Sequence, residues 1–285
     1  MVKGLIRNAL KLVPDALYLK LKYRAYMGKR LDLKDPKTFC EKLQWLKLHD
    51  RNPAYTAMVD KASAKDYAAE KIGSEHIIPT LGIWDRFDDI DFDALPDRFV
   101  LKCTHDSGGL VICRNKQTLD REKAREKIES SLKTNYYYHG REWPYKHVKP
   151  RILAETYLQE DSGDLRDYKV FCFNGEPKCT LVCADRYAGT GVRMSFYDPQ
   201  WQPMSMHWRY PPIETAVERP QNLEEMLTFA RILSQNIPFV RVDFYEVRGQ
   251  VYFGEITFFP ASGMAKFDSD EIIGTWIRLP GEAQT

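Results

Sequence analysis

The chain has 285 residues, 44% of them hydrophobic and 29% charged, and a formal net charge of +2. These values are typical of a globular protein with a sizeable core, and they exclude a disordered chain and a polycation that binds nucleic acid through its overall charge. No apolar run approaches the roughly 20 residues of a transmembrane helix, and the first residues lack the apolar stretch and cleavage site of a secretory signal.

Residues 1–30 are basic and carry apolar residues at helical spacing. Eight Lys or Arg residues stand against one acid, Asp15. Pro14 is expected to divide two short helices, whose apolar side is formed by Leu5, Ile6, Leu10, Val13, Leu17 and Leu21. Two interpretations stay open: an amphipathic helix that lies on an anionic membrane surface, or an apolar side that packs on the protein body beneath solvated lysines.

Two helices are predicted next. The first is expected within residues 36–50. Thr38 is its N-cap, and Glu41 stands three residues later as in a capping box. Residues 54–72 form the second helix, which contains the Asp60-Lys61 pair and ends at Gly73.

The period then changes from helical to that of strands. We expect one more charged helix at 118–133, capped by Thr118, and another at 221–236. The Asn174-Gly175 pair predicts a tight hairpin turn. The expected strand regions, with an aromatic and basic segment at 135–150 between them, are 77–87, 99–113, 151–158, 167–186 and 194–204.

The stretch at 241–263 predicts a hairpin with two acids on one face. If the turn takes three residues, Arg248 to Gln250, then Asp243 lies directly across from Glu255, with Thr257 on the same face. Opposed like charges destabilise a sheet, and a cation between them would relieve this. Such hard oxygen ligands suit Mg²⁺ that carries a nucleotide phosphate; the alternative is a wet face that carries acids for solubility.

Three other stretches carry charges in unusual places. Lys102 ends a predicted strand before a glycine-containing loop, which either cradles phosphates through its backbone N–H groups or is a simple hairpin turn. Glu155 lies in an apolar strand and needs a partner, either a ribose or adenine group or a basic side chain. Lys169 lies in a β-rich run and shares its face with Asp167, so the two could pair.

In this order the chain resembles the ATP-grasp superfamily, and more narrowly the TupA-like ATP-grasp family, named for teichuronopeptide synthesis. The resemblance implies an α+β fold, the ATP-grasp fold, in which two α+β subdomains grip the nucleotide. It implies an N-terminal helical segment at 1–56 and an ATP-grasp domain at 57–285, with a glycine-loop subdomain at about 99–158 and a metal-site subdomain at about 159–285. The motifs that carry it are FVLKCTHDSGG, ILAETYL, DYKVFCFNGEP and VRVDFYEVRGQVYFGEITFFPASG.

The resemblance also implies roles for single residues. Lys102, Lys169 and Arg241 would be catalytic, and Asp243 and Glu255 would hold Mg²⁺. Thr257 stands where the superfamily commonly has asparagine, so it would be a weaker third ligand and a second metal is in doubt. The nucleotide would be bound by Lys61, Lys102, Lys169, a mobile loop of Ser107, Gly108 and Gly109, and a hinge of Glu155, Thr156, Tyr157 and Leu158.

The activity that the resemblance implies is an ADP-forming ligation of a carboxylate to an amine through an acyl phosphate, with ATP and Mg²⁺. The acceptor would be a capsular polysaccharide, an exopolysaccharide or a precursor, and the partner an amine or amino acid, without nucleic acid. The protein would be cytoplasmic, its six cysteines free thiols, and residues 1–30 could contact the inner membrane leaflet. Candidates for acceptor binding are Arg141, Tyr145, Lys146, His147, Arg193 and Arg241.

Two alternatives stay open. A glycosyltransferase of capsule or exopolysaccharide synthesis would bind a sugar nucleotide through an Asp-x-Asp motif, which Asp91-Phe92-Asp93 matches in letters, although this run looks like a surface loop. An ATP-dependent sugar kinase would use the same nucleotide site and stop at a phosphate ester.

Overall fold

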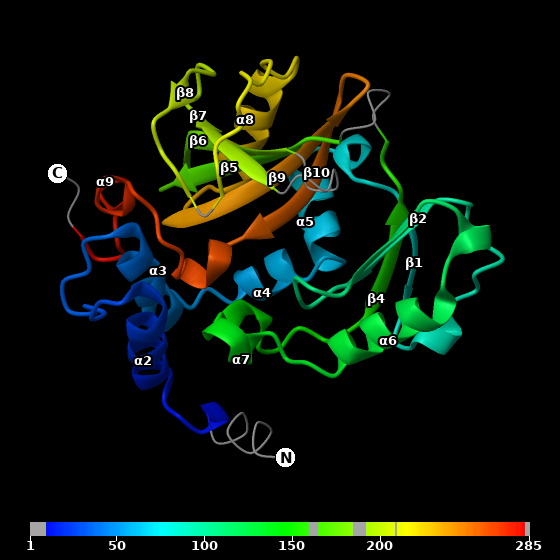
Figure 1. The fold of residues 1–285 in the computed structure, drawn as a ribbon, viewed down its shortest axis with the longest axis horizontal. Helices are drawn as coiled ribbons and strands as arrows, with labels where there is room; N and C mark the ends of the chain where they lie inside the picture. Colours follow the sequence, from blue (N-terminus) through cyan, green and yellow to red (C-terminus); the bar gives the residue numbers. More distant parts are fainter. Residues whose placement is uncertain (1–9, 160–164, 185–191, 209, 283–285) are drawn as a thin grey trace.

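The computed structural model describes residues 10–159, 165–184, 192–208 and 210–282. Two antiparallel sheets, with α4 (Ala54–Val59) and α5 (Ser63–Ile72) between them, dominate the fold (Figure 1). The four-stranded sheet has the order β1-β4-β2-β3, with β1 at Thr80–Trp84, β2 at Phe99–Cys103, β3 at Leu110–Cys113 and β4 at Ile152–Thr156. The expected α+β class is confirmed, and β1 extends this sheet to residues before the expected 99–158 range.

The six-stranded sheet has the order β10-β9-β5-β6-β7-β8 and is formed entirely by residues after 159. Its strands are β5 (Asp167–Phe173), β6 (Glu176–Ala184), β7 (Arg193–Tyr197), β8 (Pro203–Met204), β9 (Phe239–Val247) and β10 (Gln250–Thr257). The β5–β6 hairpin has the predicted turn, because Asn174 and Gly175 both adopt positive φ angles, 52° and 84°.

Helices cover the outer faces of the sheets. α6 (Arg121–Leu132) packs on β2 and β3, and α8 (Leu223–Leu233) packs on β5 and β6. α6 is capped by Asp120, whose carboxylate accepts from the Lys123 N–H, and not by Thr118 as expected. The other helices are α2 (Asp15–Met27), α3 (Phe39–His49), α7 (Tyr137–Gly140), α9 (Asp270–Gly274) and the 3-10 turns Ser74–His76, Phe87–Asp89, Lys116–Thr118, Trp143–Tyr145 and Pro260–Gly263.

The predicted capping box of α3 is present, since Thr38 and Glu41 cap each other's backbone. The single helix predicted at 54–72 is instead two helices, α4 and α5. Asp60 interrupts it, because its carboxylate accepts from the Ala62 N–H at 3.1 Å and pairs with Arg151 at 2.9 Å. These bonds hold Asp60 in an extended conformation and leave Lys61 between the helices.

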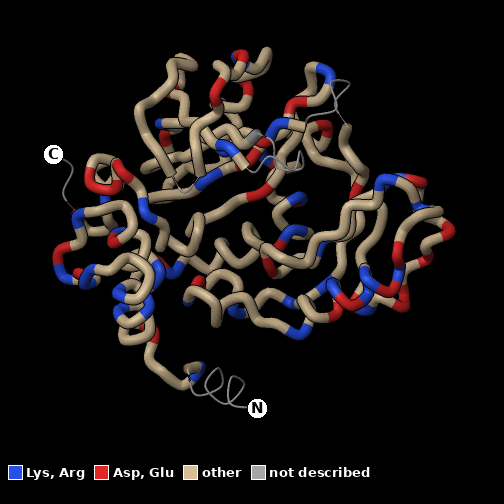
Figure 2. Tube along the Cα trace, in the orientation of Figure 1, with Lys and Arg blue, Asp and Glu red and all other residues tan. Residues whose placement is uncertain are grey.

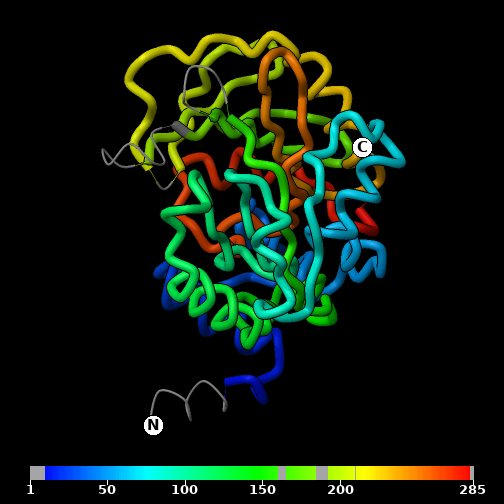
Figure 3. Tube along the Cα trace, turned by 90° about the vertical axis from the view of Figure 1, so that its right-hand side faces the viewer, coloured from blue at the N-terminus to red at the C-terminus, as the bar shows by residue number. Residues whose placement is uncertain are grey.

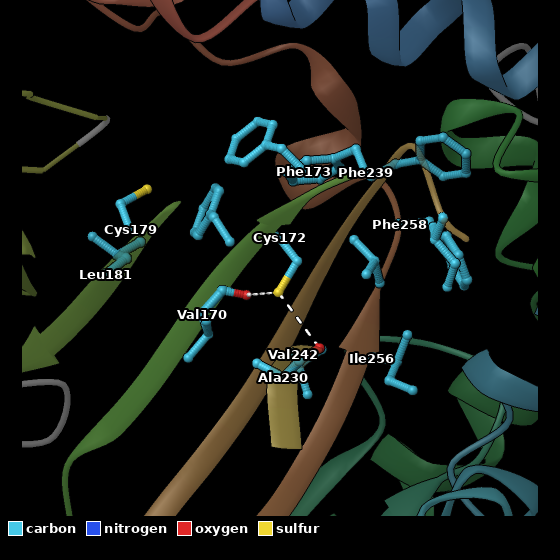
Figure 4. Close-up of a cluster of buried hydrophobic side chains, with 14 of the residues drawn as sticks. Val170, Cys172, Phe173, Cys179, Leu181, Ala230, Phe239, Val242, Ile256 and Phe258 are labelled. Atoms are coloured by element: carbon cyan, nitrogen blue, oxygen red, sulfur yellow. Dashed lines mark hydrogen bonds between the residues drawn. The ribbon is translucent and has the colours of Figure 1, made fainter. Parts of the chain in front are cut away.

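The main hydrophobic core lies beneath the six-stranded sheet. Figure 4 shows part of it, where the Cys172 thiol donates to the backbone oxygens of Val170 and Ala230. Leu19 of α2 and Leu43 of α3 belong to the same core, so the N-terminal helices pack with residues at the far end of the chain. A smaller cluster lies between α6 and the four-stranded sheet, and all six cysteines are free and buried.

The β9–β10 hairpin reaches the expected register by a different route. Its turn contains two residues, Arg248 and Gly249, at φ 51° and 75°, and not three. A bulge at Gly254 then shifts the pairing by one residue. Asp243 therefore pairs directly with Glu255, because the bulge supplies the extra residue that was expected in the turn.

The first of the two predicted N-terminal helices falls largely on residues 1–9, outside the described residues. The second is α2, which begins directly after Pro14. Its buried residues are Leu19 and Tyr23, whereas Leu17 and Leu21 of the predicted apolar side are exposed. In the described part of the chain no helix is both long and apolar enough to span a membrane.

Candidate active site

A cleft of about 390 Å³ lies where the two sheets face each other, and charged side chains from both sheets line it. Figure 2 shows Lys, Arg, Asp and Glu positions crowded between the sheets. Ten of the residues with a predicted role at the site line this cleft, namely Lys61, Lys102, Ser107, Gly108, Gly109, Glu155, Lys169, Arg241, Asp243 and Glu255, and so does Asp167, the predicted partner of Lys169.

The β9–β10 hairpin contributes a cluster of one cation and three oxygen donors. The Arg241 guanidinium donates through Nε to Asp243 Oδ1 at 2.6 Å and through Nη2 to Asp243 Oδ2 at 2.7 Å. The same Nη2 donates to Glu255 Oε1 at 3.0 Å and to Thr257 Oγ1 at 3.1 Å. Since Gly254 forms the bulge before Glu255, the strand geometry brings all three accepting oxygens to one nitrogen.

Strand β5 adds a second cation beside the same acids. Lys169 Nζ lies 2.5 Å from Asp243 Oδ2 and 2.6 Å from Asp167 Oδ2. Lys169 and Asp243 are directly paired across β5 and β9, so the predicted pair of Lys169 with Asp167 is present and Asp243 completes a triad.

The four-stranded sheet presents a separate carboxylate with two lysines. Glu155 of β4 forms ion pairs with Lys102 of β2 and, at 3.0 Å, with Lys65 of α5. Glu155 is buried and its partners are these two lysines. A basic side chain was one of the two expected partners, the other being a ribose or adenine group. The pair of cations leaves one lysine charge in excess on this wall of the cleft.

The glycine-containing loop is held by Asp106. Its carboxylate accepts from the Gly109 N–H at 3.1 Å and from the Ser131 hydroxyl, and its carbonyl accepts from Lys61 Nζ. A Cβ on Gly109 would lie 2.5 Å from Cys103 Sγ, so this position accepts no side chain, whereas a Cβ on Gly108 would meet only Asp106 Oδ2, at 3.9 Å. The loop therefore has a fixed end at Gly109 and an unobstructed backbone at Gly108.

Burial and charge shift the titration of these groups in opposite directions. Burial raises the pKa of Glu255, but Arg241 and Lys61 outweigh it and hold that pKa at about 2. Burial also raises the pKa of Asp243, against the opposing effect of Arg241 and Lys169. Burial lowers the pKa of Lys169, but Asp167 and Asp243 reverse this and raise it. Glu255 is thus ionised at neutral pH and available as an anionic ligand.

Some predicted site residues lie outside the cleft lining. Thr156 ends β4, its N–H donates to the Pro79 carbonyl, and neither it nor Tyr157 or Leu158 lines the cleft. Of the acceptor candidates only Arg241 lines it. Arg193 pairs with Glu214 at 2.8 Å. Arg141 is buried against Asp15 and donates to the carbonyls of Leu10 and Val13, which corrects its assignment to acceptor binding.

The remaining acceptor candidates, Tyr145, Lys146 and His147, also lie outside the lining. Tyr145 is in a 3-10 turn, and the Lys146 ammonium lies over the Tyr137 ring. The Lys146 ammonium is thus directed toward α7, whereas Tyr145 lies near the acids of the cleft: burial, Glu142 and Glu255 together raise its pKa.

Sequence reasoning missed Lys65, Asp106 and an apolar wall. Lys65 lies four residues after Lys61, so on the single helix predicted at 54–72 the two would share a face, and this spacing could have identified Lys65. No comparable signal marks Asp106, whose role depends on the loop fold. The wall comes from residues far apart in the chain, namely Leu181, Met194, Trp208 and Tyr245.

The Asp91-Phe92-Asp93 stretch is a surface turn, as expected. Asp91 accepts from the backbone N–H groups of Asp93 and Ala94, and Phe92 is buried in the smaller hydrophobic cluster. None of the three lines the cleft, so their local role is structural.

The donor set of the cleft fits Mg²⁺ bound together with a phosphate ligand. Within the described ranges no group of three or more His, Cys, Asp or Glu residues gathers into a metal cage. Mg²⁺ is usually held by one or two carboxylates plus substrate phosphates, and Asp243 and Glu255 supply such a pair. The same oxygens already accept from a cationic nitrogen of Arg241, so their geometry suits a positive charge.

Comparison with known families gives one match over most of the chain. The family model described as TupA-like ATPgrasp matches residues 41–278, which include every residue of the cleft described above. A comparison with curated proteins finds no match.

Solved structures of longer enzymes show weaker likeness. D-alanine–D-alanine ligase from Bacillus anthracis complexed with ATP is 14% identical at a TM-score of 0.40, over 71% of this chain and 54% of that one. The ATP-grasp ligase PsnB, complexed with a phosphomimetic variant of minimal precursor, Mg and ADP, is 12% identical. Its TM-score is 0.45, and the match covers 82% of this chain and 63% of that one. D-Alanine–D-alanine ligase from Helicobacter pylori is 15% identical at a TM-score of 0.43, over 84% of this chain and 68% of that one. The chain thus spans little more than half of the first of these, and at such TM-scores the family rests on the sequence match.

Proposed function

The chain belongs to the TupA-like ATP-grasp family, and from this premise we propose that it is an ATP-dependent, ADP-forming carboxylate–amine ligase. In the proposed reaction ATP phosphorylates a carboxylate, and an amine then attacks the acyl phosphate. A C–N bond forms as the C–O bond to phosphate breaks, and phosphate leaves with the bonding electrons.

The observation that carries the proposal is the meeting of cations and acids in one cleft. Lys61, Lys65, Lys102, Lys169 and Arg241 all line it, together with Asp243 and Glu255. Phosphoryl transfer depends on positioning and on neutralising charge, more than on covalent chemistry by the protein. A cleft whose five cations come from both sheets and from the α4–α5 segment can hold a polyanion such as a nucleoside triphosphate between them.

The cations on the two sides of the cleft are assigned different roles. Lys102 on the four-stranded sheet and Lys65 on α5 would bind phosphate oxygens, and the unobstructed backbone at Gly108 would approach the same group. Lys169 and Arg241 on the six-stranded sheet would stabilise negative charge that develops on the transferred phosphoryl group. Both contact Asp243, which fixes their direction.

Mg²⁺ would be held by Asp243 and Glu255, with Thr257 as a weaker third donor. When bound, it would neutralise charge on the phosphate oxygens. The chain's own part is to keep Glu255 ionised, which Arg241 and Lys61 do by holding its pKa at about 2.

We further propose that the carboxylate belongs to a capsular polysaccharide, an exopolysaccharide or a precursor. The family's name supports this, and so does the aromatic part of the wall, since the faces of Trp208 and Tyr245 suit a sugar ring. Arg241 could grip a carboxylate with its planar guanidinium. Neither Arg141 nor Arg193 lines the cleft, and they form ion pairs elsewhere, with Asp15 and Glu214.

Calorimetric titration of nucleotides in the presence of Mg²⁺ tests the nucleotide site. ATP should bind, and Lys102→Ala and Glu255→Gln should each weaken it at least tenfold. Matched controls are Lys133→Ala and Glu271→Gln, which change exposed residues at the C-cap of α6 and in α9. Binding of UDP- or GDP-sugars in place of ATP, indifferent to these substitutions, would overturn the ligase in favour of a glycosyltransferase.

Product analysis tests the reaction itself. ADP release should require both a uronic-acid oligosaccharide and an amine, and the product should have the mass of an amide. A product that carries a phosphate ester, formed without any amine, would instead indicate a sugar kinase at the same nucleotide site.

A further inference from the structure

Helix α2 has a buried face and an exposed apolar face. Leu19 and Tyr23 are fully buried in the main core. On the other side Leu17 and Leu21 are 50% and 58% exposed, and Leu12, just before the helix, is 88% exposed. Single exposed leucines are ordinary, but several on neighbouring turns form a patch that a protein in solution rarely maintains without use.

Cations stand among these leucines on the same face. Lys20 and Arg24 follow Leu17 by three and seven residues, the spacing of one helix face, and both are exposed. Figure 2 shows the concentration of Lys and Arg positions along α2. In the described part of the chain no carboxylate lies within ion-pair distance of Lys20 or Arg24.

The one acid of this segment is directed inward. Asp15 accepts from the Tyr137 hydroxyl at 2.5 Å and pairs with Arg141 at 3.4 Å and Arg51 at 3.6 Å. The outward surface therefore keeps its positive charge. These bonds also fix α2 to the protein body. Figure 3 shows the described residues just before α2, in dark blue, extending away from the rest of the molecule.

A groove of about 380 Å³ continues the patch toward α7. Its apolar and aromatic walls include Leu10, Tyr26 and Tyr138, and Lys11 and Lys22 stand at its edge. The two ammonium groups lie 5.1 Å and 5.4 Å from the ring centres of Tyr138 and Tyr26. Tyrosine beside lysine, with apolar surface below, is the combination that sits at a membrane–water interface.

We propose that this surface, namely the exposed face of α2 with the groove beside it, docks the protein onto an anionic lipid bilayer. The leucines would enter the boundary between headgroups and acyl chains, while Lys20 and Arg24 contact the anionic headgroups. A second copy of the chain is a poorer occupant, because a twofold contact would place each basic surface against itself. The proposal does not depend on the reaction in the cleft.

Flotation of the full chain with vesicles tests it. Vesicles of phosphatidylcholine with phosphatidylglycerol should bind the protein, and pure phosphatidylcholine vesicles should not. Each basic residue near an anionic surface contributes about fivefold to partitioning, so Lys20→Glu with Arg24→Glu should reduce binding by well over tenfold. Leu17→Gln with Leu21→Gln should reduce it at least tenfold, whereas Ile272→Gln and Lys133→Glu, exposed residues elsewhere, should leave it unchanged.

The results distinguish a lipid bilayer from a second copy of the chain as the partner of this surface. Equal binding to neutral and anionic vesicles, or none to either, overturns the proposal. So does a chain that is dimeric in solution and becomes monomeric in the leucine variant without vesicle binding. Because all four substituted residues are exposed, circular dichroism should show that each variant keeps the native fold.

Discussion

The Arg241 guanidinium reaches across the β9–β10 hairpin to the Glu255 carboxylate, with Nη2 3.0 Å from Oε1. The same nitrogen contacts Asp243 and Thr257. All three oxygen donors that the sequence marked for a metal therefore converge on one cationic atom. A bound metal would have to share these oxygens with Arg241 or take its place.

Replacing Arg241 tests whether its guanidinium occupies the position of the metal. In Arg241→Gln the acids Asp243 and Glu255 lose the cation between them, so like-charge repulsion should destabilise the hairpin. Mg²⁺ should then raise the melting temperature of the variant more than that of the wild type, because metal binding to the native state stabilises it. Thermal unfolding in MgCl₂, against KCl at matched ionic strength, measures this. Equal shifts in the two proteins would mean that Arg241 does not occupy the metal position.

Lys65 should matter for nucleotide binding as much as Lys102 does. Charge-assisted hydrogen bonds contribute about 1.5–3 kcal/mol, so Lys65→Ala should weaken Mg·ATP binding by about ten- to a hundredfold. Lys71→Ala, on the exposed side of the same helix, is the control. If the two variants bind alike, Lys65 serves only to neutralise Glu155.

The bulge at Gly254 should be essential to the acid pair. A Cβ there would lie 2.9 Å from the Asp243 carbonyl and 3.2 Å from the Tyr245 ring. Because the first of these contacts is backbone, Gly254→Ala has to shift the strand, and a shift in pairing separates Asp243 from Glu255. We expect a loss of Mg·ATP binding with the fold retained. Gly249→Ala, at a turn with φ 75° where a Cβ would meet only Gln221 Oε1, at 3.9 Å, should cost some stability but keep binding.

The chain pattern allowed the acid pair to be predicted, but not how it forms. Alternation along the strands placed Asp243, Glu255 and Thr257 on one face, as the structure has them. The turn length was wrong, because nothing in the sequence distinguished a two-residue turn plus a bulge from a three-residue turn. The break at Asp60 was also missed, since it depends on Arg151, which follows 91 residues later.

Contacts between residues far apart in the chain likewise limited how much of the site could be predicted. Lys102 and Glu155 could each be recognised as a charge in an apolar strand, but their mutual ion pair follows from β2 and β4 being neighbours. Arg141 looked like a surface cation in an aromatic segment, and it is instead buried where α7 meets α2. Its partner Asp15 lies more than a hundred residues earlier, so no local pattern could reveal the pair.

A buried lysine should give the protein's stability a pH dependence that one substitution removes. Lys47 is fully buried and donates to the Gly140 carbonyl at 2.8 Å and to the Ser262 carbonyl at 2.8 Å. Burial lowers its pKa to about 7, against the opposing effect of Glu142. Between that pH and the ordinary value near 10.5 the unfolded chain holds a proton that the native chain lacks, so the free energy of unfolding rises with pH.

Urea unfolding at pH 7 and pH 9 measures this effect. The stability advantage of the wild type over Lys47→Met should grow by up to about 1.4 kcal/mol per pH unit, because the variant lacks the titrating amine while all other groups are common to both. Lys42→Met, which removes a second buried lysine of α3 that donates to the Ile277 carbonyl, controls for lost packing. An advantage that is the same at both pH values would show that Lys47 stays charged in the native state, held so by Glu142 and the carbonyls that surround it.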